Sequence, residues 1–461
     1  MAEALQAQDF GAVGDGCMLN TAAIQAAIDA AALAGGRVVF APGVYLTGAI
    51  FLKSGVTLQL DRGVTLLGSQ ALADYPLMPT RIAGIEMVWP AALVNVCAQQ
   101  SVSITGEGCI DGDGQVFWDS YWLLRRRYEP LGLRWASDYD AQRPRLLQIY
   151  ESFDVQVGGG LLLRRAGFWG LHICYSEQVT VDGVVIRNNG DEGQRGPSTD
   201  GIDIDSSRHV LVQNADIAVN DDALVLKAGR DADGLRVAEC CEHIVIRDCI
   251  VREGAAGITF GSECSGGFRD IEVRGIEVHA PVPVGILFKS APTRGGFAER
   301  LTLRDIKLID VPVVLRATMN WNPGYSRAEI PAGMADVPAH WRVIAKPVSA
   351  EDGRTRIADV RVSGLQARGA QLAFEVEGVA QAPLVGFRFD RIDIEAQRGG
   401  YIYGAKDWRF SGAKIVLLAG EPVALPNDQD VQGLPGKTWH LQALLNKPDP
   451  SLQSFEVQDV S

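Results

Sequence analysis

The stretch DGIDIDSSRHVLVQNADIAVNDDALVLKA (residues 200–228) contains three short runs in which apolar residues alternate with other residues. Side chains alternate between the two faces of a strand, so each run predicts a short strand with one apolar face. Small and polar residues typical of turns separate the runs. The stretch therefore predicts strands joined by turns, with no helix between them.

A four-residue unit with apolar residues at its second and fourth positions recurs along the chain. It reads DVQV, QVTV, HVLV, HIVI, DIEV and RLTL, later DVRV and GFRF, and its first apolar residues are Val155, Val179, Val210, Ile244, Ile271, Leu301, Val360 and Phe387. The first five steps are 24, 31, 34, 27 and 30 residues, and the step of 59 to Val360 has room for two turns. Strands that repeat at such a period without helices indicate an all-β solenoid, a parallel β-helix. A large β-sandwich with accidental spacing is the alternative.

A second strand series lies between these units and aligns without gaps as DGIDIDS (200–206), DALVLKA (222–228), AGITFGS (256–262) and VGILFKS (284–290). One face of these strands is apolar and is predicted to lie in the core, with Ile202, Ile204, Leu224, Leu226, Ile258, Phe260, Ile286 and Phe288. The other face presents two columns, Asp203, Val225, Thr259 and Leu287, then Asp205, Lys227, Gly261 and Lys289. Because alternate side chains share a face, this outward face is the predicted cleft, a long groove suited to a polymer.

The whole chain, residues 1–461, is predicted to form one β-helix domain. One helix is expected within NTAAIQAAIDAAALAGG (20–36), inside an N-terminal cap of about residues 1–55. An aromatic and Arg-rich insertion occupies about residues 113–143, and an irregular tail occupies about residues 412–461. If the insertion overhangs one end of the cleft, the protein would act on chain ends.

The amino-acid composition limits the kinds of molecule that the protein can bind. The formal net charge of -13 argues against binding to nucleic acid and to an anionic membrane surface. No run of eighteen apolar residues occurs, and the opening MAEALQAQDF lacks the features of a secretion signal. We expect the mature, monomeric part of an exported protein, extracellular or periplasmic, with a cytoplasmic location left open. The eight cysteines show no CxxC pair and no metal-ligand spacing, so most are expected to be buried, and a disulfide remains open.

Three aspartates are predicted to meet where the second strand series begins. Asp200 and Asp222 hold equivalent positions on neighbouring coils, about 4.8 Å apart, and Asp221 precedes Asp222. Like charges this close raise the pKa of one acid. A protonated acid beside an ionised one is what cleavage of a glycosidic bond requires. Capping of turns by the three aspartates and a calcium site are the alternatives.

Further residues are candidate substrate contacts, namely Asp203, Lys227, Lys289, Arg294, Trp321 and Tyr325. Trp321 and Tyr325 lie in RATMNWNPGYS, and aromatic faces suit the apolar face of a sugar ring. Packing of Trp321 under a loop is the alternative. His172 is interpreted as a hydrogen-bonded packing histidine, and Arg125 to Arg127 as part of a solvated face.

The segments STDGIDIDSS, NDDALVLKAG and GITFGSE resemble, in order and spacing, motifs of the polygalacturonase family of glycoside hydrolases. That family reads N-T-D, D-D, G-H-G with a following G-S, then R-I-K, and the similarity covers about residues 8–330. The resemblance implies a right-handed parallel β-helix that hydrolyses a pectic polysaccharide with inversion and without a cofactor or metal. The polymer would be polygalacturonan or of the rhamnogalacturonan type. By matched position it implies that Asp221 is the general acid and that Asp200 and Asp222 hold the attacking water.

Three positions depart from the family pattern. Ala256 stands where the family has histidine, Leu287 where it has arginine, and Ser198 where it has the asparagine of N-T-D. Leucine cannot replace the forked contact of an arginine with a galacturonate carboxylate. Either Lys227, Lys289 and Arg294 bind the acid differently, or the subsite takes a neutral sugar such as rhamnose. A β-helix polysaccharide lyase, which needs calcium and a proton abstractor, and a catalytically impaired glycan-binding protein are the alternative functions.

Overall fold

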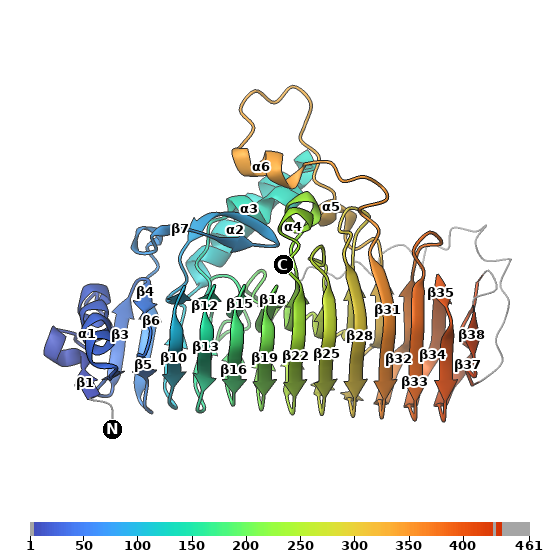
Figure 1. Ribbon diagram of the computed structural model, residues 1–461, viewed down its shortest axis with the longest axis horizontal. Helices are drawn as coiled ribbons and strands as arrows, with labels where there is room; N and C mark the ends of the chain where they lie inside the picture. The colour runs from blue at the N-terminus through green and yellow to red at the C-terminus, as the bar shows by residue number, and fades with distance from the viewer. Residues whose placement is uncertain (1–3, 427–429, 436–461) are drawn as a thin grey trace.

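The computed structural model describes residues 4–426 and 430–435, and these form a right-handed parallel β-helix. Its long axis lies horizontally in Figure 1, and most coils contribute one strand to each of three faces. Strands pair in parallel with the strands one coil before and after them. The predicted all-β solenoid is therefore confirmed, and the sandwich alternative is wrong.

The first face carries the recurring four-residue units. Its strands are β1 (Ala4–Gln6), β2 (Arg37–Val39), β5 (Thr57–Gln59), β10 (Gln100–Thr105), β13 (Phe153–Gly158), β16 (Glu177–Asp182), β19 (Arg208–Gln213), β22 (Cys241–Arg247), β25 (Phe268–Arg274), β28 (Phe297–Arg304), β31 (Arg356–Ser363), β33 (Leu384–Asp390), β36 (Trp408–Ser411) and β38 (Val431–Gln432), and β35 (Ala405–Lys406) pairs with β33.

The second face consists of short strands. These are β3 (Gly43–Thr47), β6 (Val64–Gly68), β11 (Cys109–Asp111), β14 (Leu162–Arg164), β17 (Val185–Arg187), β20 (Asp216–Ala218), β23 (Ile250–Glu253), β26 (Glu277–His279) and β29 (Lys307–Ile309).

The third face, here named the site face, contains the second strand series. Its strands are β4 (Ile50–Leu52), β9 (Val94–Cys97), β12 (Leu147–Tyr150), β15 (Leu171–Cys174), β18 (Ile202–Asp205), β21 (Asp222–Lys227), β24 (Ala256–Phe260), β27 (Val284–Lys289) and β30 (Val313–Thr318). In the last coils the long strands β32 (Gln366–Glu377) and β34 (Asp393–Tyr403) span the second and site faces, and β37 (Lys414–Glu421) pairs with β34.

The gapless alignment of the second series is the register found in the structure. Ile202 pairs with Leu224, and Leu224 pairs with Ile258. The rings of Phe260 and Phe288 stack with their centroids 4.8 Å apart. Inward residues at equivalent positions therefore pile up from coil to coil and form one continuous hydrophobic core.

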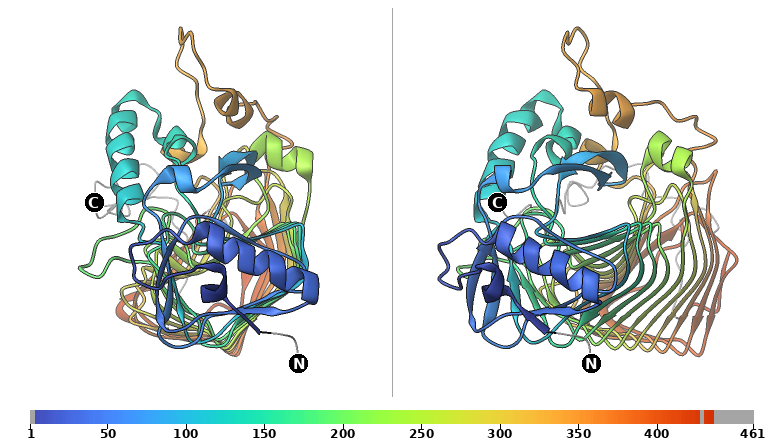
Figure 2. Two further views of the ribbon diagram at one scale, coloured as in Figure 1. Left: turned by 90° about the vertical axis from the view of Figure 1, so that its left-hand side faces the viewer. Right: turned by 60° about the vertical axis from the view of Figure 1, so that its left-hand side comes forward.

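The expected N-terminal helix is α1 (Thr21–Ala34), which ends at Gly35 in the left-handed conformation. Its residues Ile24 and Ile28 are fully buried in the main core. Figure 2 shows α1 lying across the N-terminal end of the coils. The helix thus covers apolar side chains that the first coil would otherwise expose.

Elements outside the coils gather above the site face and are here named the roof (Figures 1 and 2). The roof comprises the antiparallel hairpin β7 (Leu77–Ile82) and β8 (Ile85–Pro90), the helices α2 (Gln115–Tyr128), α3 (Ser137–Asp140), α4 (Asp231–Val237), α5 (Pro323–Ser326) and α6 (Ala339–Ile344), and the 3-10 turns η3 (Glu129–Leu131) and η4 (Arg134–Ala136). Two further 3-10 turns, η1 (Ala7–Phe10) and η2 (Leu72–Asp74), lie in the N-terminal region.

The roof has an apolar cluster of its own, separate from the β-helix core. It consists of Ile82, Ala83, Ile85, Trp89, Leu133, Trp135, Ala136, Tyr139, Phe168, Trp169, Trp341 and Ile344. Most of these residues come from the hairpin, from the predicted insertion and from α6, which lie far apart in the sequence. Their packing makes the roof an ordered layer.

The last strands, the state of the cysteines and the lack of a membrane-spanning helix in the described part are three remaining features of the fold. Strands β37 and β38 continue the coils past residue 412, where the sequence predicts an irregular tail; residues 436–461 of that tail lie outside the described residues. All eight cysteines fall in the described part and are free thiols. Within that part, no helix has both the length and the apolar character needed to cross a membrane.

Candidate active site

The structure brings the three predicted acids together at the start of the site-face strands. Asp200 lies in the turn before β18, Asp221 lies just before β21, and Asp222 is the first residue of β21. One carboxylate oxygen from each residue lies within 4.8 Å of one from each of the others. Asp200 and Asp222 are 2% and 1% exposed, whereas Asp221 is half-buried. Asp221 is therefore the acid most open to a substrate.

Asp222 is held by two donors from the following coils. Thr259 donates its hydroxyl to Oδ1 of Asp222 over 3.0 Å, and Nζ of Lys289 lies 2.5 Å from Oδ2. The same ammonium lies 4.8 Å from the centre of the Trp321 ring. These contacts fix the Asp222 carboxylate and connect it, through Lys289, to Trp321.

Lys227 is surrounded by carboxylates. Its Nζ lies 3.3 Å from Asp200, 3.4 Å from Asp203 and 3.4 Å from Glu263, and 4.7 Å from the centre of the Trp169 ring. Burial by itself would lower the pKa of Lys227, but the surrounding carboxylates hold that pKa well above its usual value. Lys227 is thus a buried ammonium that neutralises part of the acidic cluster.

Asp200 and Asp221, together with the neighbouring Asp203, have pKa values above that of a free aspartate. Burial, with the charge of Asp222, raises the pKa of Asp221, while Lys289 opposes the rise. Burial, with the charge of Asp203, raises the pKa of Asp200 well above its usual value. Burial raises the pKa of Asp203 to about 7 against the opposing charge of Lys227. Asp200, Asp203 and Asp221 therefore stay protonated to a higher pH than free aspartates do, as a proton donor requires.

Two of the predicted substrate contacts are engaged with the protein. Arg294 is fully buried, donates to the carbonyl of Ser262 over 3.0 Å and pairs with Asp231. The hydroxyl of Tyr325 donates to Glu263 over 2.8 Å. These residues stabilise the floor and the roof around the acids, whereas Trp321 remains half-buried at the surface.

The N-terminal wall of the site is a buried polar network. Arg81 of the β7–β8 hairpin lies 2.9 Å from Asp205, and Arg145 donates to Nδ1 of His172 over 2.9 Å. Burial lowers the pKa of His172 to about 4, so the ring is neutral at pH 7. His172 is a buried, hydrogen-bonded residue, in agreement with its interpretation as a packing histidine.

The outward face is not the open groove that the strand pattern predicts. Asp203, Asp205 and Lys227, all of which point outward from β18 and β21, are at most 4% exposed. The reason is the roof, which contacts this face through the Arg81 and Asp205 pair and through the apolar cluster around Trp169. The acids consequently lie at the bottom of an enclosed site.

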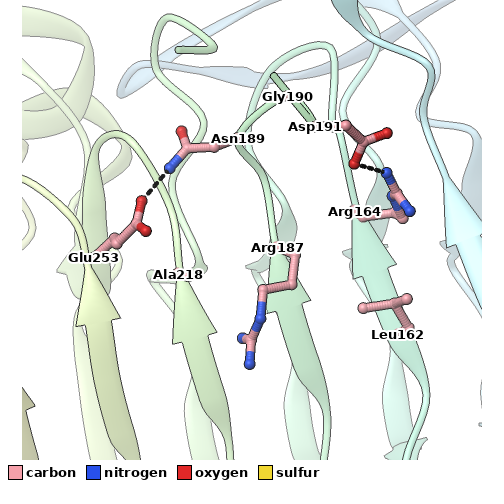
Figure 3. A pocket seen from close by; sticks show the side chains of 8 residues that line it. All are labelled: Leu162, Arg164, Arg187, Asn189, Gly190, Asp191, Ala218 and Glu253. Carbon is pink, nitrogen blue, oxygen red and sulfur yellow. Dashed lines mark hydrogen bonds and ion pairs between the residues drawn. The ribbon is translucent and has the colours of Figure 1, made fainter. Parts of the chain in front are cut away.

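A separate depression of about 320 Å³ lies on the second face, next to the turn that leads to the acids. It is lined by Leu162, Arg164, Arg187, Asn189, Gly190, Asp191, Ala218 and Glu253 (Figure 3). Figure 3 shows Asn189 bound to Glu253 and Arg164 bound to Asp191, and Arg187 binds Asp216 over 2.7 Å. Its charged groups are thus satisfied by the protein, and none of the three acids lines it.

Among residues 4–426 and 430–435, two groups of side chains could hold a metal ion by distance alone, the three acids and the set of His172, Cys174 and Asp205. Both groups lie against cations. Lys227 and Lys289 contact the acids, and Arg81 and Arg145 contact the second group. Fixed positive charges repel a divalent cation, so this environment does not favour the calcium alternative.

The sequence reasoning did not predict several residues of the site. Glu263, in the segment GSE, binds Lys227 and Tyr325, and Thr259 binds Asp222. Both residues lie on the coil that follows the acids, and this position in the strand alignment could have identified them as site residues. Arg81 is 124 residues from its partner Asp205, and no local pattern connects them.

Comparisons with known proteins show the family of the chain and relatives with the same fold. The model of "Glycosyl hydrolases family 28" matches residues 43–317, and that of "Rhamnogalacturonase A/epimerase, pectate lyase-like" matches residues 4–69. A "Probable polygalacturonase" of Vitis vinifera is 28% identical, over 84% of this chain and 73% of its own length. An "Exo-poly-alpha-D-galacturonosidase" of Dickeya chrysanthemi is 26% identical, over 90% and 74%. The crystal structure of an exopolygalacturonase from Thermotoga maritima is similar with a TM-score of 0.72 and 26% identity, covering 86% of this chain and 87% of that one.

Proposed function

The chain belongs to family 28 of the glycosyl hydrolases, and from this premise we propose that it cleaves α-glycosidic bonds of a pectic poly- or oligosaccharide from chain ends. The observation that carries the proposal is the convergence of Asp200, Asp221 and Asp222 within 4.8 Å in an enclosed site. The relatives named for exo-acting enzymes support the chain-end mode. An enclosed site suits a chain end better than the middle of a polymer.

In this proposal Asp221 is the general acid. It is the most exposed of the three acids, and its raised pKa keeps its proton available. The proton passes from Asp221 to the oxygen of the leaving sugar as the glycosidic bond breaks. A water attacks the anomeric carbon and gives its proton to the protein.

Asp200 and Asp222 hold the attacking water. Oδ1 of Asp200 is buried and has no hydrogen-bond partner among the described residues, so it is able to accept a hydrogen bond from that water. We assign proton acceptance to Asp222, which is ion-paired with Lys289. Asp200, whose pKa burial and the charge of Asp203 raise well above its usual value, orients the water.

The six predicted substrate-binding residues divide by exposure. Trp321 and Tyr325 keep exposed surface, and Lys289, which is 8% exposed, lies against the Trp321 ring, so these three are proposed to contact sugars. The other three, Asp203, Lys227 and Arg294, are enclosed by charged partners, so we assign to them the positioning of the acids and the roof.

Replacement of Asp221 tests the proposal. Asp221→Asn removes the donated proton without changing the shape of the side chain, and release of reducing ends from pectic oligosaccharides should fall by at least about 100-fold. Asp248→Asn, at an exposed aspartate, is the matched control and should leave the rate unchanged. Full activity of the Asp221 variant with an unchanged melting curve would overturn the assignment.

The anomeric configuration of the first product tests the stereochemistry. Separations of about 6.5–9.5 Å between two carboxyl groups predict inversion and about 5–5.5 Å predict retention. Three carboxyl groups share this site, so a rule based on the distance between two of them does not assign the stereochemical outcome. We propose inversion from the resemblance to the polygalacturonase family. Proton NMR of the fresh product should show the inverted anomer. An unsaturated product that disappears with a chelator would instead favour the lyase alternative.

A further inference from the structure

A small apolar patch begins one rung beyond the acids on the site face. Ala256, Val284, Leu287 and Val313 form this patch, which is separate from the β-helix core. Ala256 pairs directly with Asp222 in the sheet, and Val284 pairs with Val313 on the coils that follow. Since neighbouring rungs are about 4.8 Å apart, the patch lies within the reach of the sugar next to the cleaved bond.

Trp321 and Leu372 pack against the patch from outside. The four patch residues are at most 6% exposed, while Trp321 is half-buried and keeps exposed surface. A sugar bound on this side therefore meets an indole supported from below by aliphatic groups. Such a surface favours the apolar face of a sugar ring or a methyl substituent.

The outward cations of these coils are already occupied. On β24, β27 and β30 they are Lys289 and Arg316. Lys289 lies 2.5 Å from Asp222, and Arg316 donates twice to Glu375 over 2.9 and 2.7 Å. A free carboxylate placed against the patch would lose its hydration without gaining a cation of its own.

We propose that the sugar on the C-terminal side of the acids has an uncharged C5 substituent that ends in a methyl group. Two sugars share this chemistry, a 6-deoxyhexose such as rhamnose and a methyl-esterified galacturonate. The inference rests on the proposed function, because it concerns the partner sugar at the bond that the three acids cleave. Trp321 and Leu287 determine this specificity.

Three matched oligosaccharides test the proposal through their values of kcat/KM. They are free α-1,4-linked galacturonan, the same chain methyl-esterified, and a chain of alternating galacturonate and rhamnose. The esterified or the rhamnose-containing chain should be hydrolysed at least about ten-fold faster than the free acid chain, and which of the two is faster identifies the source of the methyl group. Fastest hydrolysis of the free acid chain would overturn this inference alone. No hydrolysis of any of the three would overturn the proposed function and this inference with it.

A charge introduced at Leu287 provides a second test. Leu287→Arg supplies a guanidinium beside the patch, so it should shift the rate ratio toward the free acid chain by about ten-fold. Leu211→Arg places the same change on the outward side of β19, on the first face, and should leave the ratio unchanged. An unshifted ratio in a Leu287 variant with an intact melting curve would contradict the proposal.

Trp321 lies outside the strands and outside the β-helix core, so its replacement leaves the packing of that core unchanged. Trp321→Ala should raise KM for the preferred chain by about ten-fold with a smaller change in kcat, whereas Trp321→Phe should keep most of the affinity. An unchanged KM in the alanine variant would show that the indole does not contact the sugar and would overturn the proposed subsite.

Discussion

At the scale of single residues, the surroundings of the three aspartates separate their roles. Asp222 has partners for both oxygens in Thr259 and Lys289, whereas one oxygen of Asp200 is buried without a partner in the described part of the chain. Asp221 keeps an exposed surface and a raised pKa. In the proposed mechanism one residue type would thus supply a proton donor, a proton acceptor and a water ligand.

Removal of Lys289 should move the basic limb of the pH profile. Burial is the main cause of the raised pKa of Asp221, and the charge of Lys289 opposes it. In Lys289→Met this opposition is lost, so Asp221 stays protonated to higher pH. The basic limb of kcat/KM should therefore shift upward while the maximal rate falls. Lys307→Met, at an exposed lysine of β29, is the control, and a downward shift in the Lys289 variant would contradict the assigned general acid.

At the scale of elements, packing between distant segments forms the roof over the site face. Trp135 and Trp341 pack with ring centroids 5.1 Å apart, joining the predicted insertion to α6. Tyr139 donates to the carbonyl of Ala83 over 2.9 Å, joining the insertion to the hairpin. Contacts of this kind hold the roof together over the site face, so the proposed chain-end action should depend on the integrity of the roof.

A substitution that leaves a cavity in the roof should change the length of the sugar products that the protein releases. Trp135 is fully buried, and Trp135→Ala removes packing equivalent to about 3–5 kcal/mol from the roof cluster without touching the β-helix core. Time courses resolved by chromatography should change from single sugar units to a mixture that includes longer oligosaccharides. Trp122→Ala, at a half-buried position on α2 outside the cluster, should keep the original products. Unchanged products in the Trp135 variant would show that chain-end action does not depend on the packing of the roof.

At the scale of the whole molecule, a stack of coils needs a covered end. A solenoid buries each coil only against its neighbours, and an open terminal coil exposes apolar side chains and strand edges. Helix α1 covers that end at the N-terminus with Ile24 and Ile28. The stability of the whole β-helix therefore depends on one short amphipathic helix.

A truncation on the buried face of α1 should destabilise the entire protein. Ile28 is fully buried, so Ile28→Ala should lower the free energy of unfolding by roughly 2–5 kcal/mol and promote aggregation on heating. Leu33 lies on the same helix and is 93% exposed, so Leu33→Ala should have almost no effect. Urea denaturation and light scattering measure both effects, and equal behaviour of the two variants would exclude a capping role for α1.

The sequence alone determined the coils, their register and the meeting of the acids. Alternating apolar residues at a regular period specify which side chains enter the core, and equivalent positions on adjacent rungs necessarily lie side by side. For this reason Asp200 and Asp222 were placed correctly relative to each other, as was the column of Asp222 and Ala256.

Only the tertiary structure decided that the site is enclosed and that most of its charges are paired. The roof joins segments separated by more than one hundred residues, such as Arg81 with Asp205 and Trp341 with Asp140. Strand periodicity reports the direction of a side chain but not what packs over it. Lys227 and Arg294, which the sequence offered as substrate contacts, are buried because carboxylates from other coils and from the roof reach them first.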